Sequence, residues 1–122
     1  MPSLNKDVLQ KFLHKIYKGY YRSVEYHNDM HAADVLQMSY LILTNGGVIE
    51  WAELNQLDQL AVFISAVCHD YGHDGFTNAY HVNSISERAV RYSDQSVQEN
   101  FHVAESFAIL QNEEFNFLQE FS

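Results

Sequence analysis

Cysteine, proline and basic side chains are scarce in this chain of 122 residues. Its single cysteine, Cys68, excludes an intrachain disulfide, which fits a reducing compartment. Cys68 lies in an apolar run, which predicts a small buried side chain. Proline is confined to Pro2. The 7 Lys and Arg residues are outnumbered by 16 Asp and Glu, and the net charge of −9 argues against nucleic acid or an anionic membrane surface as a partner.

Long apolar runs are absent as well. No uninterrupted apolar segment reaches the roughly 18 residues that a helix needs to span a bilayer. Residues 1–7 lack the apolar core of a signal peptide. These features argue against membrane insertion, and we expect a cytoplasmic or other intracellular location.

A helical pattern fills most of the chain. Hydrophobic residues make up 47% of it, enough for a core. Apolar side chains recur at helical spacing, and no window alternates with a period of two for long enough to indicate a sheet. We therefore predict an all-α fold of about six or seven helices, forming one domain or part of a larger one.

The predicted helices begin at several capping residues. The first covers residues 4–20 after an N-cap at Ser3, and the second follows Asn28 or Asp29 and ends near Asn45. A third begins at residues 50–53 and continues to residue 68. A short helix over residues 85–90 follows a cap at Asn83 or Ser84, and a last helix covers about residues 96–111.

The polar stretch over residues 69–78 is the strongest candidate for a functional site. His69 and His73 are four residues apart, so on a helix they share a face. Asp70 between them can accept a hydrogen bond or coordinate a metal, and Gly75 suggests a turn or a close approach. Imidazole and carboxylate ligands suit zinc, manganese, iron or magnesium. The alternative interpretation is a helix C-terminus capped by polar residues.

Two further pairs of polar residues have helical spacing. His27 and His31 are four residues apart at the start of the second predicted helix, and Glu99 and His102 are three apart on the last one. A single pair of this kind is more often a capping or packing feature. Together with residues 69–78, however, they would bring three histidine-containing helix ends to one polar pocket.

In combination, these motifs resemble the catalytic domain of the class I cyclic nucleotide phosphodiesterases, from about residue 20 to residue 122. The matching motifs are Tyr26-His27-Asn28-x-x-His31, then His69-Asp70-x-x-His73-x-Gly75-x-x-Asn78, and then Tyr92-x-Asp94-x-Ser96-Val97-x-Glu99-Asn100-x-His102. The resemblance implies a multi-helix, metal-dependent phosphohydrolase fold of the HD type. It also implies that residues 1–122 are a partial catalytic domain, because the family domain is much longer than this chain.

The resemblance assigns roles to the matched residues. His27 corresponds to the general acid that protonates the leaving 3′-oxygen. His31 and His69 correspond to zinc ligands, and Asp70 to the carboxylate that bridges Zn²⁺ to a second ion, Mg²⁺ or Mn²⁺. His73 corresponds to a histidine near the bridging water and the phosphate.

Four other matched residues would touch the substrate or orient the metal-bound water and the metal ligands. They are Tyr26, Asn78, Glu99 and His102. Three positions depart from the family pattern. Many members carry an acidic residue at Gly72, proline at Asp74 and histidine at Phe101.

The function implied is hydrolysis of 3′,5′-cyclic nucleotides, cAMP or cGMP, to 5′-nucleoside monophosphates, with activity that requires residues beyond this chain. One alternative is a non-catalytic phosphodiesterase-like module, and another is an HD-type phosphohydrolase with a different substrate. Apolar residues near the C-terminus would be exposed unless a missing subdomain or a protein partner covers them. They are Phe107, Leu110, Phe115, Phe117, Leu118 and Phe121.

Overall fold

The computed structural model of the chain describes residues 4–121, with the exception of the Glu120 side chain. As predicted, this part of the chain is all-helical and has no strand. Its elements are α1 (Lys6–Gly19), α2 (Asp29–Thr44), α3 (Val48–Trp51), α4 (Gln56–Cys68), α5 (Asn78–Asn83), α6 (Glu87–Arg91), α7 (Val97–Leu110) and a closing 3₁₀ turn, η1 (Gln119–Phe121).

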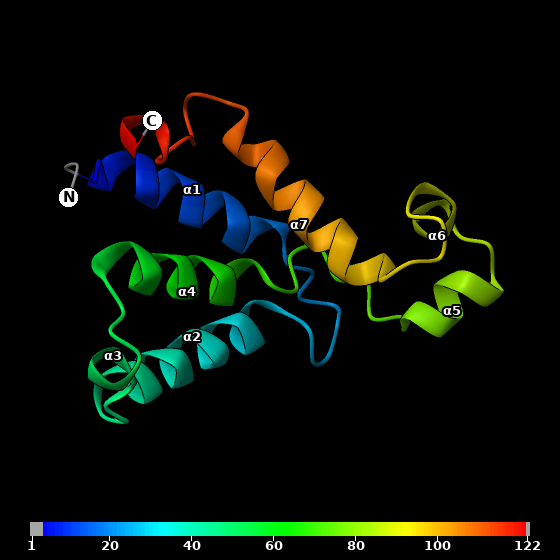
Figure 1. Ribbon diagram of the computed structural model, residues 1–122. Helices are drawn as coiled ribbons and strands as arrows, with labels where there is room; N and C mark the ends of the chain where they lie inside the picture. Colours follow the sequence, from blue (N-terminus) through cyan, green and yellow to red (C-terminus); the bar gives the residue numbers. More distant parts are fainter. Residues whose placement is uncertain (1–3, 122) are drawn as a thin grey trace.

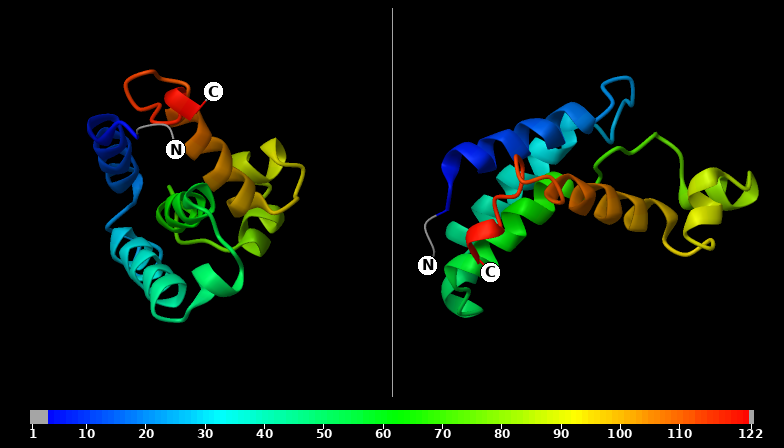
Figure 2. Two further views of the ribbon diagram at one scale, coloured as in Figure 1. Left: turned by 60° about the vertical axis from the view of Figure 1, so that its left-hand side comes forward. Right: turned by 90° about the horizontal axis from the view of Figure 1, so that it is seen from above.

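The arrangement of the helices determines where the polar motifs meet. Helices α2 and α4 lie side by side and antiparallel, joined by the short α3, while α1 and α7 pack on α4 and on each other (Figure 1). The short helices α5 and α6 pack against α7 and lie away from α1 and α2 in both views of Figure 2. Consequently the start of α2, the end of α4 and the start of α7 lie at the same end of the bundle.

The core forms between α1, α7 and the C-terminal segment. Phe12 and Ile16, one turn apart on α1, are 1% and 2% exposed, and the Phe12 ring lies 4.9 Å from that of Phe117, centroid to centroid. Burying each of these side chains contributes about 1.5–3 kcal/mol. The other buried members of this cluster are Tyr20, Ala32 and Leu110.

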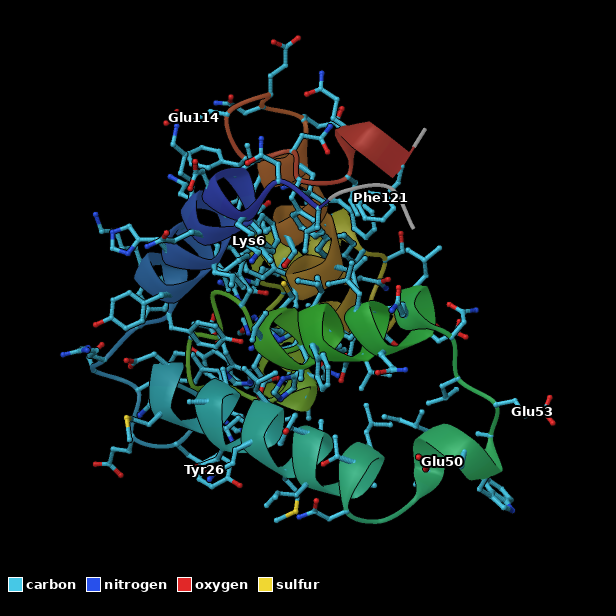
Figure 3. The ribbon with its side chains drawn as sticks, turned by 90° about the vertical axis from the view of Figure 1, so that its left-hand side faces the viewer. Lys6, Tyr26, Glu50, Glu53, Glu114 and Phe121 are labelled. Atoms are coloured by element: carbon cyan, nitrogen blue, oxygen red, sulfur yellow. The ribbon has the colours of Figure 1, made fainter. Side chains whose placement is uncertain are left out.

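Two predicted helix starts differ from the structure. Ser3 lies outside the described residues, and the side chain of Asn5 accepts hydrogen bonds from the first backbone N–H groups of α1. The predicted continuous helix from residue 50 is wrong, because α3 ends at Trp51 and α4 starts at Gln56. Asn55 and Asp58 form a capping box there, which favours a new helix start over continuation. The intervening Glu53 has a φ of 51° and points into solvent (Figure 3).

The cap predicted at Asn83 or Ser84 is also wrong. These residues belong to the end of α5, and α6 is capped by Ser86, whose Oγ accepts from the backbone N–H of Ala89. Ile85 between the two helices has a φ of 52°. The hydroxyl of Ser86 also lies 2.8 Å from His81 Nδ1, and this contact from outside the helix helps to fix the boundary.

Candidate active site

The loop between α4 and α5 carries the central polar motif. Helix α4 ends at Cys68, with His69 as its C-cap, so the prediction that His69 and His73 share a helical face is wrong. The backbone turns at Gly72, which has a φ of +69°, and His73 follows in the loop. A turn of this kind suits glycine because the left-handed conformation carries no side-chain penalty.

His31, His69 and Asp70 converge as the sequence predicts. The Nε2 atoms of His31 and His69 lie 3.3 and 3.1 Å from Asp70 Oδ2 and 3.2 Å from each other. All three ligand atoms therefore lie within 4.8 Å of one another. Helix α2 supplies His31 from its first turn, and the end of the neighbouring, antiparallel α4 supplies the other two.

Hydrogen bonding fixes the tautomer of His69. Its Nδ1 atom lies 2.8 Å from the carbonyl oxygen of Ala66, which can only accept, so Nδ1 carries the proton. In the neutral ring the Nε2 lone pair then faces the carboxylate of Asp70. In the protonated ring Nε2–H donates to Asp70, and this hydrogen bond raises the pKa of His69. A proton or a metal ion between these acceptors would relieve their repulsion.

Asp70 also faces a second group. His102 Nδ1 lies 2.7 Å from the carbonyl oxygen of Tyr71, so its Nε2 lone pair is directed to the site and lies 3.8 Å from Asp70 Oδ1. Burial lowers the pKa of His102 and favours the neutral ring. Burial alone would raise the pKa of Asp70, but hydrogen bonding to His69 and the nearby histidines hold it below its usual value. Asp70 Oδ2 thus faces His31 and His69, whereas Asp70 Oδ1 faces His102.

His73 has the opposite tautomer from His69 and His102. The backbone N–H of Gly75 donates to His73 Nδ1 at 2.9 Å, so the neutral ring carries its proton on Nε2. Burial, followed by the nearby His27, lowers the pKa of His73. Although a ring nitrogen of His73 lies within 4.8 Å of ligand atoms from Asp70 and His102, this tautomer makes it a hydrogen-bond donor rather than a metal ligand.

His27 and Tyr26 border the site on the loop before α2. The ring of His27 stacks on that of His73, with centroids 4.1 Å apart, and meets the His31 ring edge to face at 5.7 Å. The ring of Tyr26 lies 4.8 Å from that of His31, and it is 66% exposed beside α2 in Figure 3.

Asn78 and Glu99 join α5 to α7. The amide of Asn78 donates to both carboxylate oxygens of Glu99, at 2.9 and 3.2 Å, and its Oδ1 accepts from the backbone N–H of Gln98. The hydrogen bond from Asn78 is the main cause of the lowered pKa of Glu99. The predicted site residues therefore belong to separate segments of the chain but lie at one end of the bundle.

Sequence reasoning missed Gln98, because a lone glutamine on a helix gives no signal.

An apolar groove of about 470 Å³ begins at His69, Glu99 and His102 and runs between α4 and α7. Phe107 and Leu118 in its wall are 59% and 38% exposed, as predicted for the C-terminal region. Other apolar side chains of the groove are Leu57, Leu60, Ala61, Ile64 and Val103.

Several other predictions for apolar side chains need correction. Leu110 and Phe117 are only 8% and 3% exposed, because the segment after α7 folds back and places Phe117 against Phe12. Cys68 is half-buried, and burial raises the pKa of its thiol to about 11. No helix of the described residues combines the length and apolar character needed to cross a membrane.

Comparison with known proteins identifies the family. Residues 26–122 match the model of the 3′5′-cyclic nucleotide phosphodiesterase family. The chain is 43% identical over 117 residues to the dual specificity calcium/calmodulin-dependent 3′,5′-cyclic nucleotide phosphodiesterase 1 of Drosophila melanogaster, a match that covers 94% of this chain and 14% of that protein. It is 40% identical over 111 residues to the 3′,5′-cyclic-nucleotide phosphodiesterase regA of Dictyostelium discoideum, covering 91% of this chain and 14% of the relative.

Solved structures agree with the sequence comparison. The phosphodiesterase domain of the RhoPDE fusion protein from the choanoflagellate Salpingoeca rosetta superposes with a TM-score of 0.87 at 38% identity. That match covers 96% of this chain and 36% of the compared chain, so the present chain spans about a third of the length of the solved domain. The family match over most of the sequence and the shared fold show that the chain belongs to the 3′,5′-cyclic nucleotide phosphodiesterase family.

Proposed function

We propose that this chain is the metal-binding part of a catalytic domain that hydrolyses 3′,5′-cyclic nucleotides, cAMP or cGMP, to 5′-nucleoside monophosphates. The observation that carries the proposal is the convergence of the Nε2 lone pairs of His69 and His102 on the two oxygens of Asp70. Activity would also depend on residues outside the chain, because the matched catalytic domain is about three times as long.

The side chains present fit two divalent metal ions. His31, His69 and Asp70 offer two imidazole nitrogens and a carboxylate oxygen, a set that suits Zn²⁺. The other oxygen of Asp70 would serve a second ion, Mg²⁺ or Mn²⁺, which prefer oxygen ligands. When bound, such a pair of ions acidifies a water molecule and offsets the negative charge of the phosphodiester.

The remaining residues would position the reactants and move protons. His27, held against the rings of His73 and His31, would donate the proton that the leaving 3′-oxygen needs. The Nε2–H of His73 would donate to the attacking water or the phosphate. Glu99, held by Asn78, would orient water at the site together with His102. Tyr26 would contact the substrate from the rim.

Hydrolysis assays with cAMP and cGMP, on the protein at its natural length with Zn²⁺ and Mg²⁺, test this function. Asp70→Ala should abolish turnover together with metal binding. His27→Ala should keep its metal content but slow turnover by about 10²–10⁴-fold, the usual contribution of a positioned general acid. His14, an exposed histidine on α1, supplies the matched control, since His14→Ala should leave turnover unchanged. Full turnover by Asp70→Ala would contradict the proposal.

A second candidate function is a non-catalytic module whose apolar groove binds another protein. The groove between α4 and α7 favours it, because an apolar surface of this size is more stable when covered. An HD-type phosphohydrolase with another substrate would share the metal ligands. Metal binding without turnover of any phosphodiester would favour the module, and turnover of a different phosphodiester would favour the other hydrolase.

A further inference from the structure

A second polar cluster contacts the loop between α4 and α5 and is centred on Arg88 of α6. One guanidinium nitrogen donates to Gln98 Oε1 at 2.7 Å and lies 3.5 Å from Asp74 Oδ2. The other donates to the carbonyl oxygen of Gly72 at 3.0 Å. The Arg88 side chain is only 17% exposed. Arg88 therefore links the loop after α4 to both α6 and α7.

Asp74 in the same cluster is held by several donors. Gln98 Nε2 donates to Asp74 Oδ1 at 2.8 Å and to the carbonyl oxygen of Phe76 at 2.9 Å. His81 Nε2 lies 3.3 Å from the same oxygen of Asp74. Burial would raise the pKa of Asp74, but the hydrogen bond from Gln98, the backbone N–H of Phe76 and the charge of Arg88 hold it below its usual value. These contacts therefore favour the charged form of the carboxylate.

The ring of Phe101 completes the cluster. The Arg88 guanidinium lies over this ring, 3.5 Å from its centroid, in a cation–π contact. The ring also packs close to the backbone at Gly72, where a Cβ atom would lie 3.0 Å from Phe101 Cε1. Arg88 thus contacts three residues around the loop, Gly72, Asp74 and Phe101.

We infer that Arg88 is a positioning residue for the metal site. By joining the Gly72 carbonyl, the Asp74 carboxylate and the Phe101 ring, it fixes the loop that presents Asp70 and His73. The same guanidinium therefore contacts all three residues. The inference rests on the proposed function only in requiring that the site binds a metal ion.

The chemistry of arginine explains why this residue suits the position. Its planar group offers five N–H donors and a flat face, so it can bind two acceptors and stack on a ring at the same time. A lysine would keep the charge but could not span these partners. Removing the guanidinium would take one donor each from Asp74 and the Gly72 carbonyl, which lie in a largely buried region. The loop would then move so that these acceptors can bind water instead.

Titration with Co²⁺ alone tests this role, because the visible absorption of bound Co²⁺ reports its coordination geometry. The variants are Arg88→Met, Arg88→Lys and the double variant Asp74→Leu with Arg88→Leu, all in the protein at its natural length. The matched control is Arg91→Met on the same helix, whose side chain is 61% exposed and pairs with Glu105 instead. Circular dichroism and thermal unfolding establish the folded fraction of each protein.

We expect Arg88→Met to weaken Co²⁺ binding by about 10–100-fold, the usual effect of removing a group that orients metal ligands, and to change the absorption spectrum. Arg88→Lys should recover only a part of the affinity. The double variant should bind more tightly than Arg88→Met, because it leaves no unpaired carboxylate. Arg91→Met should match the unmodified protein in both affinity and spectrum.

Three results would overturn the inference. Arg88→Met and Arg88→Lys could bind Co²⁺ as Arg91→Met does, or they could lower only the unfolding temperature while the folded protein binds Co²⁺ normally, which would mean a purely structural role. The unmodified protein could also fail to bind Co²⁺, which would contradict the proposed function as well. If Co²⁺ binding depends on Arg88 but cyclic nucleotides are not hydrolysed, the inference stands and the proposed function fails.

Discussion

Two polar clusters flank the loop over residues 69–78, and they differ in how well their atoms are paired. In the metal-site cluster, formed by His31, His69, Asp70 and His102, two ring lone pairs and a carboxylate point at one another. In the brace cluster, formed by Asp74, Arg88 and Gln98, each close contact joins a donor to an acceptor. On one side of the loop a permanent cation, Arg88, supplies the counter-charge, whereas on the other side a proton or a bound cation would have to supply it.

This difference predicts that the brace cluster contributes mainly to stability and the metal-site cluster mainly to function. A satisfied buried network adds rigidity and contributes to the folded state without any ligand. A cluster with more acceptors than hydrogens is unfavourable until something binds, and natural proteins tolerate such conflicts mainly at functional sites. Substitutions of the two aspartates should therefore have opposite consequences, although the two carboxylates belong to the same loop.

The largest effect is expected from Asp70→Asn. The amide keeps the shape of the side chain but replaces one oxygen by a donor, which can satisfy the lone pair of His69 or His102. Affinity for Zn²⁺ should fall by more than about 100-fold, because a charged ligand is lost. At a pH above the raised pKa of His69, where its ring is neutral, the unfolding temperature of the metal-free protein should stay equal or rise. Isothermal titration and calorimetry measure the two quantities, and a marked loss of metal-free stability would contradict this account of the metal-site cluster.

Asp74→Asn should show the reverse pattern. It removes the negative charge and one of the two acceptor oxygens, so that an amide donor faces either Arg88 or the donors on the other oxygen. We therefore expect the metal-free protein to lose about 1–3 kcal/mol of unfolding free energy. Zn²⁺ affinity should fall much less than in Asp70→Asn. Urea unfolding in the presence of a chelator provides the measurement. An Asp74→Asn protein as stable as the unmodified one would show that the brace cluster contributes nothing to folding.

A smaller effect is expected from Gly72→Ala. The residue has a φ of +69°, and the new Cβ would press on Phe101, so we expect a loss of about 1–2 kcal/mol. Gly47→Ala is a close control, because Gly47 has a φ of +68° but nothing lies within 4 Å of its Cβ position. The difference between the two variants isolates the contact with Phe101. Equal losses would mean that the ring moves aside freely.

The smallest expected effect is a pH dependence of the brace cluster. Since the pKa of Asp74 is lowered in the folded protein, the unfolded state binds more protons near the usual value of 3.8. The contribution of Asp74 to stability is therefore full above this value and is lost as the pH falls through the lowered folded pKa. The stability difference between the unmodified protein and Asp74→Asn should shrink over that range. Parallel urea titrations at several acidic pH values can detect this convergence.

Sequence reasoning predicted the metal-site cluster better than the brace cluster, for a physical reason. Polar motifs beside apolar helical runs, together with the resemblance to the phosphodiesterases, predicted that His31, His69 and Asp70 converge, and their ligand atoms do lie together. Arg88 and Gln98 lie on different helices, with no periodic signal, and their pairing depends on how α6 packs against α7.

Helix boundaries show the same limit of local patterns. The apolar spacing on both sides of residues 52–55 predicts one helix, but the capping box at Asn55 divides it into α3 and α4. Ser86 begins α6 with help from His81, a contact that propensity alone does not indicate. Where a boundary depends on such side-chain contacts, helical periodicity is not enough to find it.

The hydrogen bond from His69 to Ala66 has a consequence for folding. The carbonyl groups in the last turn of a helix have no partner within the helix, and at the end of α4 the ring of a proposed metal ligand satisfies one of them. An ion that holds the His69 ring also holds this carbonyl, so filling the site and closing the last turn of α4 are coupled. Hydrogen exchange of the amides in that turn should slow when the metal ion is added, even when no substrate is present.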